Sequence, residues 1–516
     1  MLTNWLQPKL SGEFPAFAIL AILLGAGVLR FWDLGGPSLW TDELYSVSFS
    51  RLPQGMLWSD WMVREPNPPL YYALLQVWIS VFGESELALR ALSATLGMLS
   101  VFAMFLVGRA LHSNGAGLIA ACLTAVSAQQ LQNSQQVRAY MLTFFAAALA
   151  IYALIRLTDR WREDNSTARS ALPYLALYTA ASATAFYAHT TMFILPVLAN
   201  VYVVWMWAFK TERRLPEAGA WLAANAILTL VCAWWLLITI RQVVDGANAV
   251  GWLAEPTVRD AILKTSHVIG TRSIDSLNLL SAVVFGALIA WGAWRLQLER
   301  RLLVAIFGIG VPLLLFAFSF IQPMFMERTI FWAQAVYFPC LAAGILSLPV
   351  RRAVLPVAIA CIFILLVDAI TWRDREYREP WREIAAALRD QADSDDVVLV
   401  YDADVAINLQ YYCRNGGCTR ARVSAMRAYP GKATLVDLFP DPLIDQTNVS
   451  EAIGKADRIW VLRRGVERGF DADPEKLLVG LAHQEYADVL SDTQNAKQTP
   501  GGNNMKLAVW RPISHR

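Results

Sequence analysis

The sequence is poor in charged residues. Only 17% of its 516 residues are Asp, Glu, Lys or Arg, whereas soluble domains carry about 25%. At the same time, 56% of the residues are hydrophobic and 20 are tryptophan. This composition excludes an ordinary soluble protein and indicates a polytopic membrane protein.

Two further absences narrow the functional class. The net charge is only +2 and the chain has no basic low-complexity tract, so nothing indicates a nucleic-acid partner. The first apolar run lacks a small-x-small cleavage site. We therefore expect it to be retained as the first membrane span and not removed as a signal peptide.

Cysteine is also scarce, with six residues in the chain. Four lie in apolar runs, where they suit a small apolar role: Cys122, Cys232, Cys340 and Cys361. The other two, Cys413 and Cys418, enclose Arg-Asn-Gly-Gly, a turn sequence that predicts two strands joined there. A disulfide between them suits an oxidising compartment, whereas zinc would need two further ligands that are not evident.

The apolar runs predict about eleven transmembrane helices, each long enough to cross a bilayer. They lie at about 14–31, 87–108, 115–133, 139–157, 171–188, 191–209, 218–240, 277–294, 302–320, 329–349 and 353–371. Pro68–Phe82 is shorter and begins with two prolines, so we expect an interfacial helix there.

The short loops predict the orientation of these helices. Nearly every loop on one side is basic, as Arg109, Arg300 and Arg351 illustrate. Basic short loops face the cytoplasm, which places the N-terminus there and the C-terminus outside. The expected location is the inner (plasma) membrane of a bacterium.

The composition becomes that of a soluble protein after Thr371. We therefore expect a transmembrane domain over 1–371 and an extracytoplasmic α/β domain over 372–516. A helical pattern covers Trp381–Arg389. Short β-like runs follow at Val397–Tyr401, Arg458–Leu462 and Lys506–Trp510.

An acidic pair, Asp42 and Glu43, follows the first apolar run on its outer side. A charge at the centre of a membrane helix costs about 2.5–3.5 kcal/mol, so such a pair is expected outside the hydrocarbon core. Trp40 and Tyr45, which flank the pair, are side chains that favour the membrane interface. The pattern favours a membrane-surface site over an idle solvated loop.

Other polar residues are predicted on the same outer face. They are Glu65, Asn67 and Tyr71, then Arg138 and Tyr140, then His189, and finally Arg328. Arginine at the outer edge runs against the positive-inside bias, so it either extends to lipid headgroups or binds a phosphate. Carboxylates together with arginines predict transfer of a group from a lipid phosphate. The Asp would take a proton from the acceptor and the arginines would stabilise the departing phosphate.

Several motifs, taken in order, resemble those of bacterial GT-C membrane glycosyltransferases, relatives of protein O-mannosyltransferases and of the lipid A aminoarabinose transferase. They read Ser-Leu-Trp-Thr-Asp-Glu, Asn-Pro-Pro-Leu-Tyr-Tyr, Gln-x-x-Arg-x-Tyr, Tyr-Ala-His and Glu-Arg-Thr, and the resemblance covers about 1–371. It implies a GT-C-like helical fold, a polyprenyl-phosphate sugar donor and inversion at the anomeric carbon.

The resemblance also implies roles for individual residues. Asp42 takes the catalytic role, Glu43 the adjacent acidic one, and Arg138 with Tyr140 the Arg-x-Tyr site. Contacts to the donor phosphate or substrate are expected from the remaining outer residues Arg328, His189, Glu65, Asn67 and Tyr71. A divalent metal ion, if one takes part, would be held by Asp42, Glu43 and His189.

Two other functions stay open at this point. A non-catalytic carrier or flippase of lipid-linked sugars would line its path with intramembrane charges, yet the acidic residues keep mostly to the outer edge, with Asp368 the main exception. An enzyme similar to the O-antigen ligases would use a diphosphate-linked donor. The sequence identifies neither the sugar nor the acceptor, which is a lipid, a glycan or a protein of the cell envelope.

Overall fold

The fold is described from a computed structural model. It describes residues 13–162, 168–208, 215–244, 255–375, 379–401, 406–413, 421–426, 449–454, 456–464, 478, 481–486 and 505–512. The chain forms two compact units. The helical unit comprises Met1–Leu34 and Pro53–Asp374, and the sheet unit comprises Gly35–Leu52 and Arg375–Arg516.

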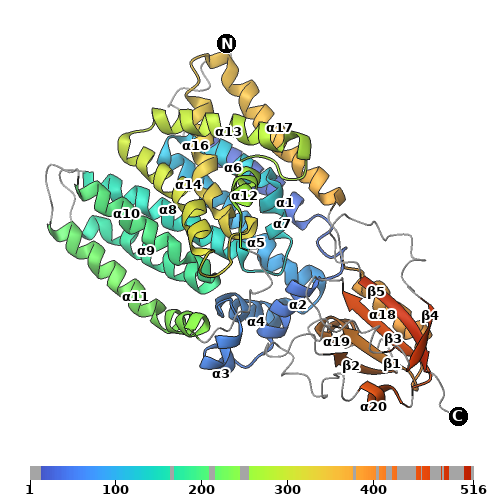
Figure 1. Ribbon diagram of the computed structural model, residues 1–516. Helices are drawn as coiled ribbons and strands as arrows, with labels where there is room; N and C mark the ends of the chain where they lie inside the picture. Colours follow the sequence, from blue (N-terminus) through green and yellow to red (C-terminus); the bar gives the residue numbers. More distant parts are fainter. Residues whose placement is uncertain are drawn as a thin grey trace. The chain divides into compact units, whose positions relative to one another are not determined.

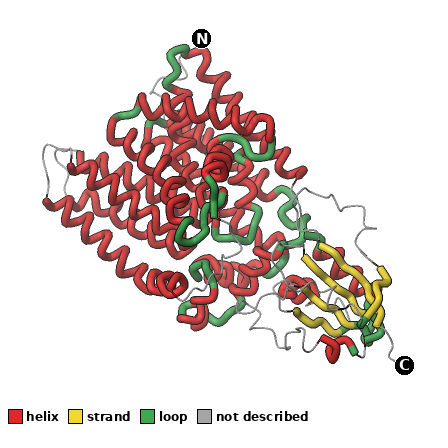
Figure 2. Tube along the Cα trace, in the orientation of Figure 1, coloured by secondary structure: helices red, strands yellow, loops and turns green. Residues whose placement is uncertain are grey.

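The helical unit consists of helices joined by short loops (Figures 1 and 2). Its described elements are α1 (Glu13–Phe31), α3 (Gln54–Leu57), η2 (Asp60–Arg64), α4 (Leu70–Phe82), α5 (Glu86–Leu111), α6 (Asn114–Val126), α7 (Ala128–Ser134), α8 (Tyr140–Arg162), α9 (Ala168–Ala188), η3 (Thr190–Phe193), α10 (Ile194–Ala208), α11 (Leu215–Val244), α12 (Val258–Ile269), α13 (Asp275–Arg295), α14 (Leu298–Phe318), α15 (Glu327–Ile330), η4 (Phe331–Ala333), α16 (Gln334–Leu346) and α17 (Arg351–Arg375).

The protein is a multi-pass membrane protein, as its composition predicts. Within the described residues, eight helices are long and apolar enough to cross a membrane, and three shorter apolar helices accompany them: Ala16–Phe31, Leu70–Phe82 and Asn114–Val126. The run predicted as one span at 115–133 is divided into α6 and α7, with Ser127 between them in an extended conformation. The total of eleven spans stays a prediction.

Helix α16 is almost wholly buried and packs against α13, α6 and α5. Close contact between neighbouring helices depends on small residues. A Cβ atom at Gly117 of α6 would lie 2.6 Å from the carbonyl oxygen of Phe105 in α5, and one at Gly108 would lie 2.8 Å from that of Ala116. Only glycine allows the two backbones to approach so closely.

The sheet unit is built on a five-stranded sheet. Its described elements are α2 (Thr41–Ser50), α18 (Trp381–Gln391), β1 (Val397–Tyr401), α19 (Ala406–Cys413), β2 (Arg422–Met426), α20 (Val449–Ile453), β3 (Ile459–Arg464), β4 (Ala482–Tyr486) and β5 (Met505–Pro512). The strand order is β2-β1-β3-β5-β4. Strands β2, β1 and β3 are parallel, whereas β5 runs antiparallel to both β3 and β4.

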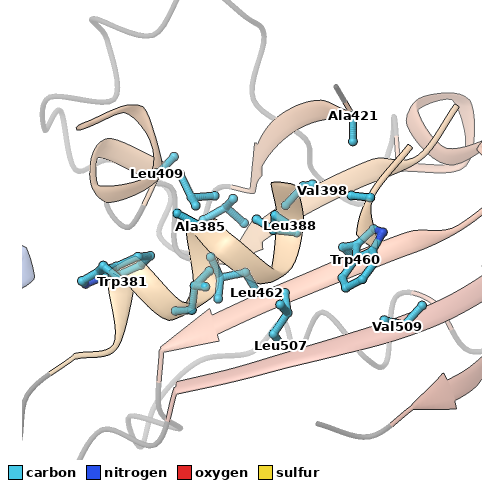
Figure 3. Packing of buried hydrophobic residues seen from close by; sticks show 14 residues of the cluster. Trp381, Ala385, Leu388, Val398, Leu409, Ala421, Trp460, Leu462, Leu507 and Val509 are labelled. Atoms are coloured by element: carbon cyan, nitrogen blue, oxygen red, sulfur yellow. The ribbon is translucent and has the colours of Figure 1, made fainter. Parts of the chain in front are cut away.

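Both faces of the sheet are covered, and this explains why strand β1 is apolar throughout. Val398 and Val400 face the core that contains α18 and α19, while Val397 and Leu399 face the core that contains α20. Figure 3 shows the first of these cores, in which Trp381, Ala385 and Leu388 of α18 lie against the sheet. Their spacing places them on one side of the helix, which is the pattern of an amphipathic helix.

The sequence predictions for this unit meet different outcomes. The helix at Trp381–Arg389 and the three predicted strands are confirmed as α18, β1, β3 and β5. The prediction of two strands joined at Cys413 is wrong, because helix α19 ends at that residue. Cys418 lies outside the described residues, so the disulfide stays a prediction.

Candidate active site

The acidic pair lies at the N-terminus of α2, in the sheet unit. Trp40 precedes the helix in an extended conformation, and its N–H donates to Oε2 of Glu43 at 3.1 Å. This bond is the backward half of a capping box and explains why Glu43 is fully buried. Asp42 is only half-buried and lies in the first helical turn, where a negative charge is favourable. Of the two carboxylates, Asp42 is the more exposed.

Four predicted residues gather in the helical unit around the ring of Tyr140. The guanidinium carbons of Arg138 and Arg328 lie 5.7 and 6.0 Å from the ring centroid. The ring centroid of His189 lies 6.0 Å from the same point. We call these residues, Arg138, Tyr140, His189 and Arg328, the arginine–tyrosine cluster. Arg138 lies two residues before Tyr140, which begins α8. His189 directly follows α9 and Arg328 lies in α15, so the fold brings together residues that are far apart in the sequence.

His189 is a neutral member of this cluster. Burial, together with the positive charges of Arg138 and Arg328, lowers the pKa of His189 to about 3. Its Nδ1 accepts a bond from the N–H of Thr191 at 3.3 Å, so the ring proton is on Nε2. The positive charge of the cluster therefore comes from its two arginines.

Buried Glu65 and half-buried Asn67 are hydrogen-bonded to each other, and Glu65 lies close to Arg138. Oε1 of Glu65 accepts bonds from Nδ2 of Asn67 at 2.7 Å, from its N–H at 3.2 Å and from the hydroxyl of Tyr72 at 2.9 Å. Burial raises the pKa of the Glu65 carboxyl, while the bonds from Asn67 and the charge of Arg138 oppose the rise. Gln242 fixes the loop, since its Nε2 donates to the carbonyl oxygen of Glu65 at 2.7 Å. The Glu65 carboxyl thus lies close enough to Arg138 for the two groups to interact electrostatically.

Tyr71 reaches the cluster through the backbone. Its hydroxyl and that of Ser93 are hydrogen-bonded at 2.9 Å, and the Ser93 hydroxyl donates to the carbonyl oxygen of Arg138 at 3.3 Å. Tyr71 is fully buried. Its hydroxyl thus supports the chain at Arg138 through Ser93, and its contact with a substrate stays a prediction.

Sequence reasoning missed a second polar group beside Arg328. Glu327 accepts from Nδ1 of His267 at 2.6 Å and forms an ion pair with Nε of Arg272 at 2.8 Å. Asp368 accepts from the N–H groups of Arg272 at 3.0 Å and of Ser273 at 2.6 Å. The available signal was Asp368 itself, because a carboxylate near the end of an apolar run needs partners of this kind.

The arginine–tyrosine cluster is suited to an anion. Guanidinium groups bind phosphate through charge-assisted and often bidentate hydrogen bonds, and two of them lie around one aromatic ring here. Where side chains are described, no group of three or more His, Cys, Asp or Glu residues is placed to hold a metal ion.

Comparisons with known proteins agree with this picture. Residues 66–236, which include Asn67, Arg138, Tyr140 and His189, match the family model described as dolichyl-phosphate-mannose-protein mannosyltransferase. No curated protein matches the sequence.

Solved structures resemble the whole chain. ArnT from Cupriavidus metallidurans in the apo state is 12% identical, with 96% of this chain and 97% of that chain covered and a TM-score of 0.62. The structure of the same enzyme bound to undecaprenyl phosphate is 11% identical, with 97% of this chain and 98% of that chain covered and a TM-score of 0.57. The apo oligosaccharyltransferase of Archaeoglobus fulgidus is 13% identical, with 88% and 70% covered and a TM-score of 0.57.

At these identities the structural likeness shows the fold, and it confirms the predicted GT-C-like architecture. The family match adds similarity in sequence over residues 66–236, which include three of the four residues of the arginine–tyrosine cluster. Residues 66–236 thus resemble the dolichyl-phosphate-mannose-protein mannosyltransferase family, and the chain as a whole has the fold of GT-C glycosyltransferases such as ArnT.

Proposed function

We propose that this protein is an inverting glycosyltransferase that moves a sugar from a polyprenyl-phosphate donor to an acceptor hydroxyl at the outer face of a bacterial inner membrane. The observation that carries the proposal is the pair of guanidinium groups, Arg138 and Arg328, around Tyr140 and beside a neutral His189. The undecaprenyl phosphate bound to the similar ArnT structure supports a lipid phosphate as the ligand.

The reaction is a single displacement. The acceptor oxygen attacks the anomeric carbon, and the bond between that carbon and the phosphate oxygen breaks with its electron pair going to the phosphate. Attack opposite to the departing phosphate inverts the anomeric configuration. Asp42, the more exposed of the two carboxylates, takes the proton of the acceptor hydroxyl.

The change in phosphate charge gives the arginines their role. The donor is a phosphodiester with one negative charge, whereas the departing polyprenyl phosphate is a monoester that carries up to two. Negative charge therefore grows on the phosphate as the bond breaks. Arg138 and Arg328 stabilise this developing charge more than the charge of the bound donor, which is the condition for lowering the barrier.

The supporting residues keep this pair in place. The buried carboxylate of Glu65, bonded to Asn67, lies close enough to Arg138 to influence it electrostatically, and Tyr71 supports the backbone of Arg138 through Ser93. The basic short loops support a cytoplasmic N-terminus and an extracytoplasmic location for residues 372–516. The transferred sugar is a hexose or a pentose, and the acceptor is an envelope lipid, glycan or protein.

The test is a transfer assay with the purified full-length protein in detergent. Synthetic polyprenyl-monophosphate and polyprenyl-diphosphate sugars, each with hexosyl and pentosyl versions, are incubated with a membrane extract as acceptor. We expect consumption of a monophosphate donor and release of one polyprenyl phosphate for each sugar transferred, measured by mass spectrometry. Use of the diphosphate donors alone would instead indicate a ligase-like enzyme. Translocation of the donor in proteoliposomes without any transfer would indicate a carrier.

A further inference from the structure

Helix α2, which carries Asp42, has an N-cap residue whose side chain accepts no bond from the helix N–H groups. The residue before it is Trp40, whose indole nitrogen donates hydrogen bonds and accepts none. The N–H groups of Glu43 and Leu44 are satisfied by the carbonyl oxygen of Trp40 at 3.0 and 3.1 Å. The N–H of Thr41, the first helical residue, needs another acceptor.

That acceptor is a carboxylate from far along the chain. Oε2 of Glu379 accepts from the N–H of Thr41 at 2.9 Å and from its hydroxyl at 2.9 Å. The same oxygen accepts from Nε1 of Trp381 at 2.8 Å. Glu379 is buried, and a buried carboxylate persists only where donors compensate for the lost water. Two of its donors, the N–H and the hydroxyl of Thr41, belong to the first residue of α2.

Helix α19 adds two bonds to the same segment. Nδ2 of Asn408 donates to the hydroxyl of Thr41 at 2.8 Å, and Asn408 is itself fully buried. The hydroxyl of Tyr412 accepts from the N–H of Leu39 at 2.7 Å. Leu39, which lies two residues before α2, and Thr41, which begins it, are thus both held by side chains from 379–412.

Arg382 holds the start of the segment 35–41, which leads into α2. It donates to the carbonyl oxygens of Gly35 at 2.8 Å and of Gly36 at 2.7 Å. All these residues belong to the sheet unit. These bonds hold the segment that leads into α2 at Gly35, Gly36 and Leu39. Glu379 holds Thr41, the residue directly before Asp42.

We infer that Glu379 is a positioning residue for Asp42. It supplies the helix cap that the local sequence lacks, fixes the first turn of α2 and thereby orients the carboxylate that takes the acceptor proton. The segment after residue 375 is then part of the catalytic apparatus and not only an appended domain. This inference rests on the proposed function, which gives Asp42 its catalytic role.

The first test separates the turnover number from the donor KM. Glu379→Ala removes the acceptor, and because a small displacement of a catalytic group costs up to about 10²-fold in rate, we expect kcat to fall by about 10²-fold with the donor KM nearly unchanged. Glu379→Gln keeps one acceptor oxygen and should recover part of that loss. Asp390→Ala, which removes an exposed carboxylate on α18, is the matched control and should behave like the wild type. Wild-type kcat in Glu379→Ala would overturn the inference.

The second test does not depend on activity. Amide hydrogen exchange of the peptides covering 35–52 is compared in the full-length wild type, Glu379→Ala and Asp390→Ala. Loss of the cap should speed exchange at the start of α2 in Glu379→Ala only. If Glu379→Ala does not fold, Tyr412→Phe, which removes the acceptor for Leu39, should show the same two effects to a smaller degree.

The outcomes distinguish the two proposals. A wild-type protein that transfers no sugar would refute the proposed function, while the exchange measurement would still decide whether Glu379 caps α2. Unchanged exchange in Glu379→Ala and in Tyr412→Phe, or faster exchange with wild-type kcat, would refute the positioning role.

Discussion

Replacing the two arginines of the arginine–tyrosine cluster should weaken binding of polyprenyl phosphate strongly. A hydrogen bond to a charged group contributes about 1.5–3 kcal/mol, which corresponds to about 10- to 100-fold in affinity. We expect losses of this size for Arg138→Ala and for Arg328→Ala. The phosphodiester donor carries less negative charge than the monoester product, so the affinity for the donor should fall less than the affinity for the product. The turnover number kcat should fall together with the affinity for the product.

The geometry predicts that the two losses are coupled. Both guanidinium carbons lie within 6.0 Å of the centroid of one ring, that of Tyr140, so both are placed to contact the same phosphate. Substitutions of residues that share a partner cause losses of binding free energy that do not add. The loss in the double variant should therefore differ from the sum of the two single losses. Lysine at either position should restore only part of the affinity, because its ammonium cannot form two parallel bonds.

The assay is isothermal titration calorimetry of the detergent-solubilised protein with polyprenyl phosphate and with a non-hydrolysable donor analogue. Arg162→Ala is the matched control, because Arg162 ends α8 whereas Tyr140 begins it. The length of that helix separates the two by about 33 Å. Wild-type affinity and turnover in both alanine variants would show that Arg138 and Arg328 extend to lipid headgroups and do not bind the substrate.

Three further predictions concern other parts of the chain. Because the pKa of His189 is lowered to about 3 while an unfolded histidine titrates near 6.5, acidification through this range protonates the unfolded state and reduces stability. His189→Gln should therefore lose less stability than the wild type in thermal unfolding as the pH falls from about 6.5, and equal losses would contradict the buried neutral state. An alkaline-phosphatase fusion after Arg516 should be active and one after Arg301 inactive, and the reverse result would refute the proposed orientation. Non-reducing peptide mapping should find Cys413 and Cys418 linked, a prediction that two free thiols in native membranes would contradict.

Much of the fold could be predicted from local sequence. Apolar runs of sufficient length predict membrane helices, and the amphipathic spacing of Trp381, Ala385 and Leu388 predicts α18. The break between α6 and α7 was harder to see. Gln130 lies in the predicted span, but its Nε2 donates to Oε1 of Gln334 at 2.8 Å, and this partner from α16 is what allows a polar side chain to be buried there.

The candidate site could be predicted in its residues but not in its partners. The sequence singles out Asp42, yet nothing local indicates that Glu379 caps its helix, because the two lie more than three hundred positions apart. The turn sequence after Cys413 likewise predicts a hairpin, whereas the preceding residues form a helix whose Leu409 packs in the core of the sheet unit. In both cases, contacts between distant segments decide the local structure.

The central claim is tested most directly by the single-turnover rate of Asp42→Asn with a polyprenyl-phosphate sugar donor. Asparagine keeps the shape of the side chain and removes the base, so donor binding should survive. The rate of transfer should fall by about 10²- to 10⁴-fold, the usual contribution of a general base. A folded Asp42→Asn protein that transfers sugar at nearly the wild-type rate would contradict the mechanism.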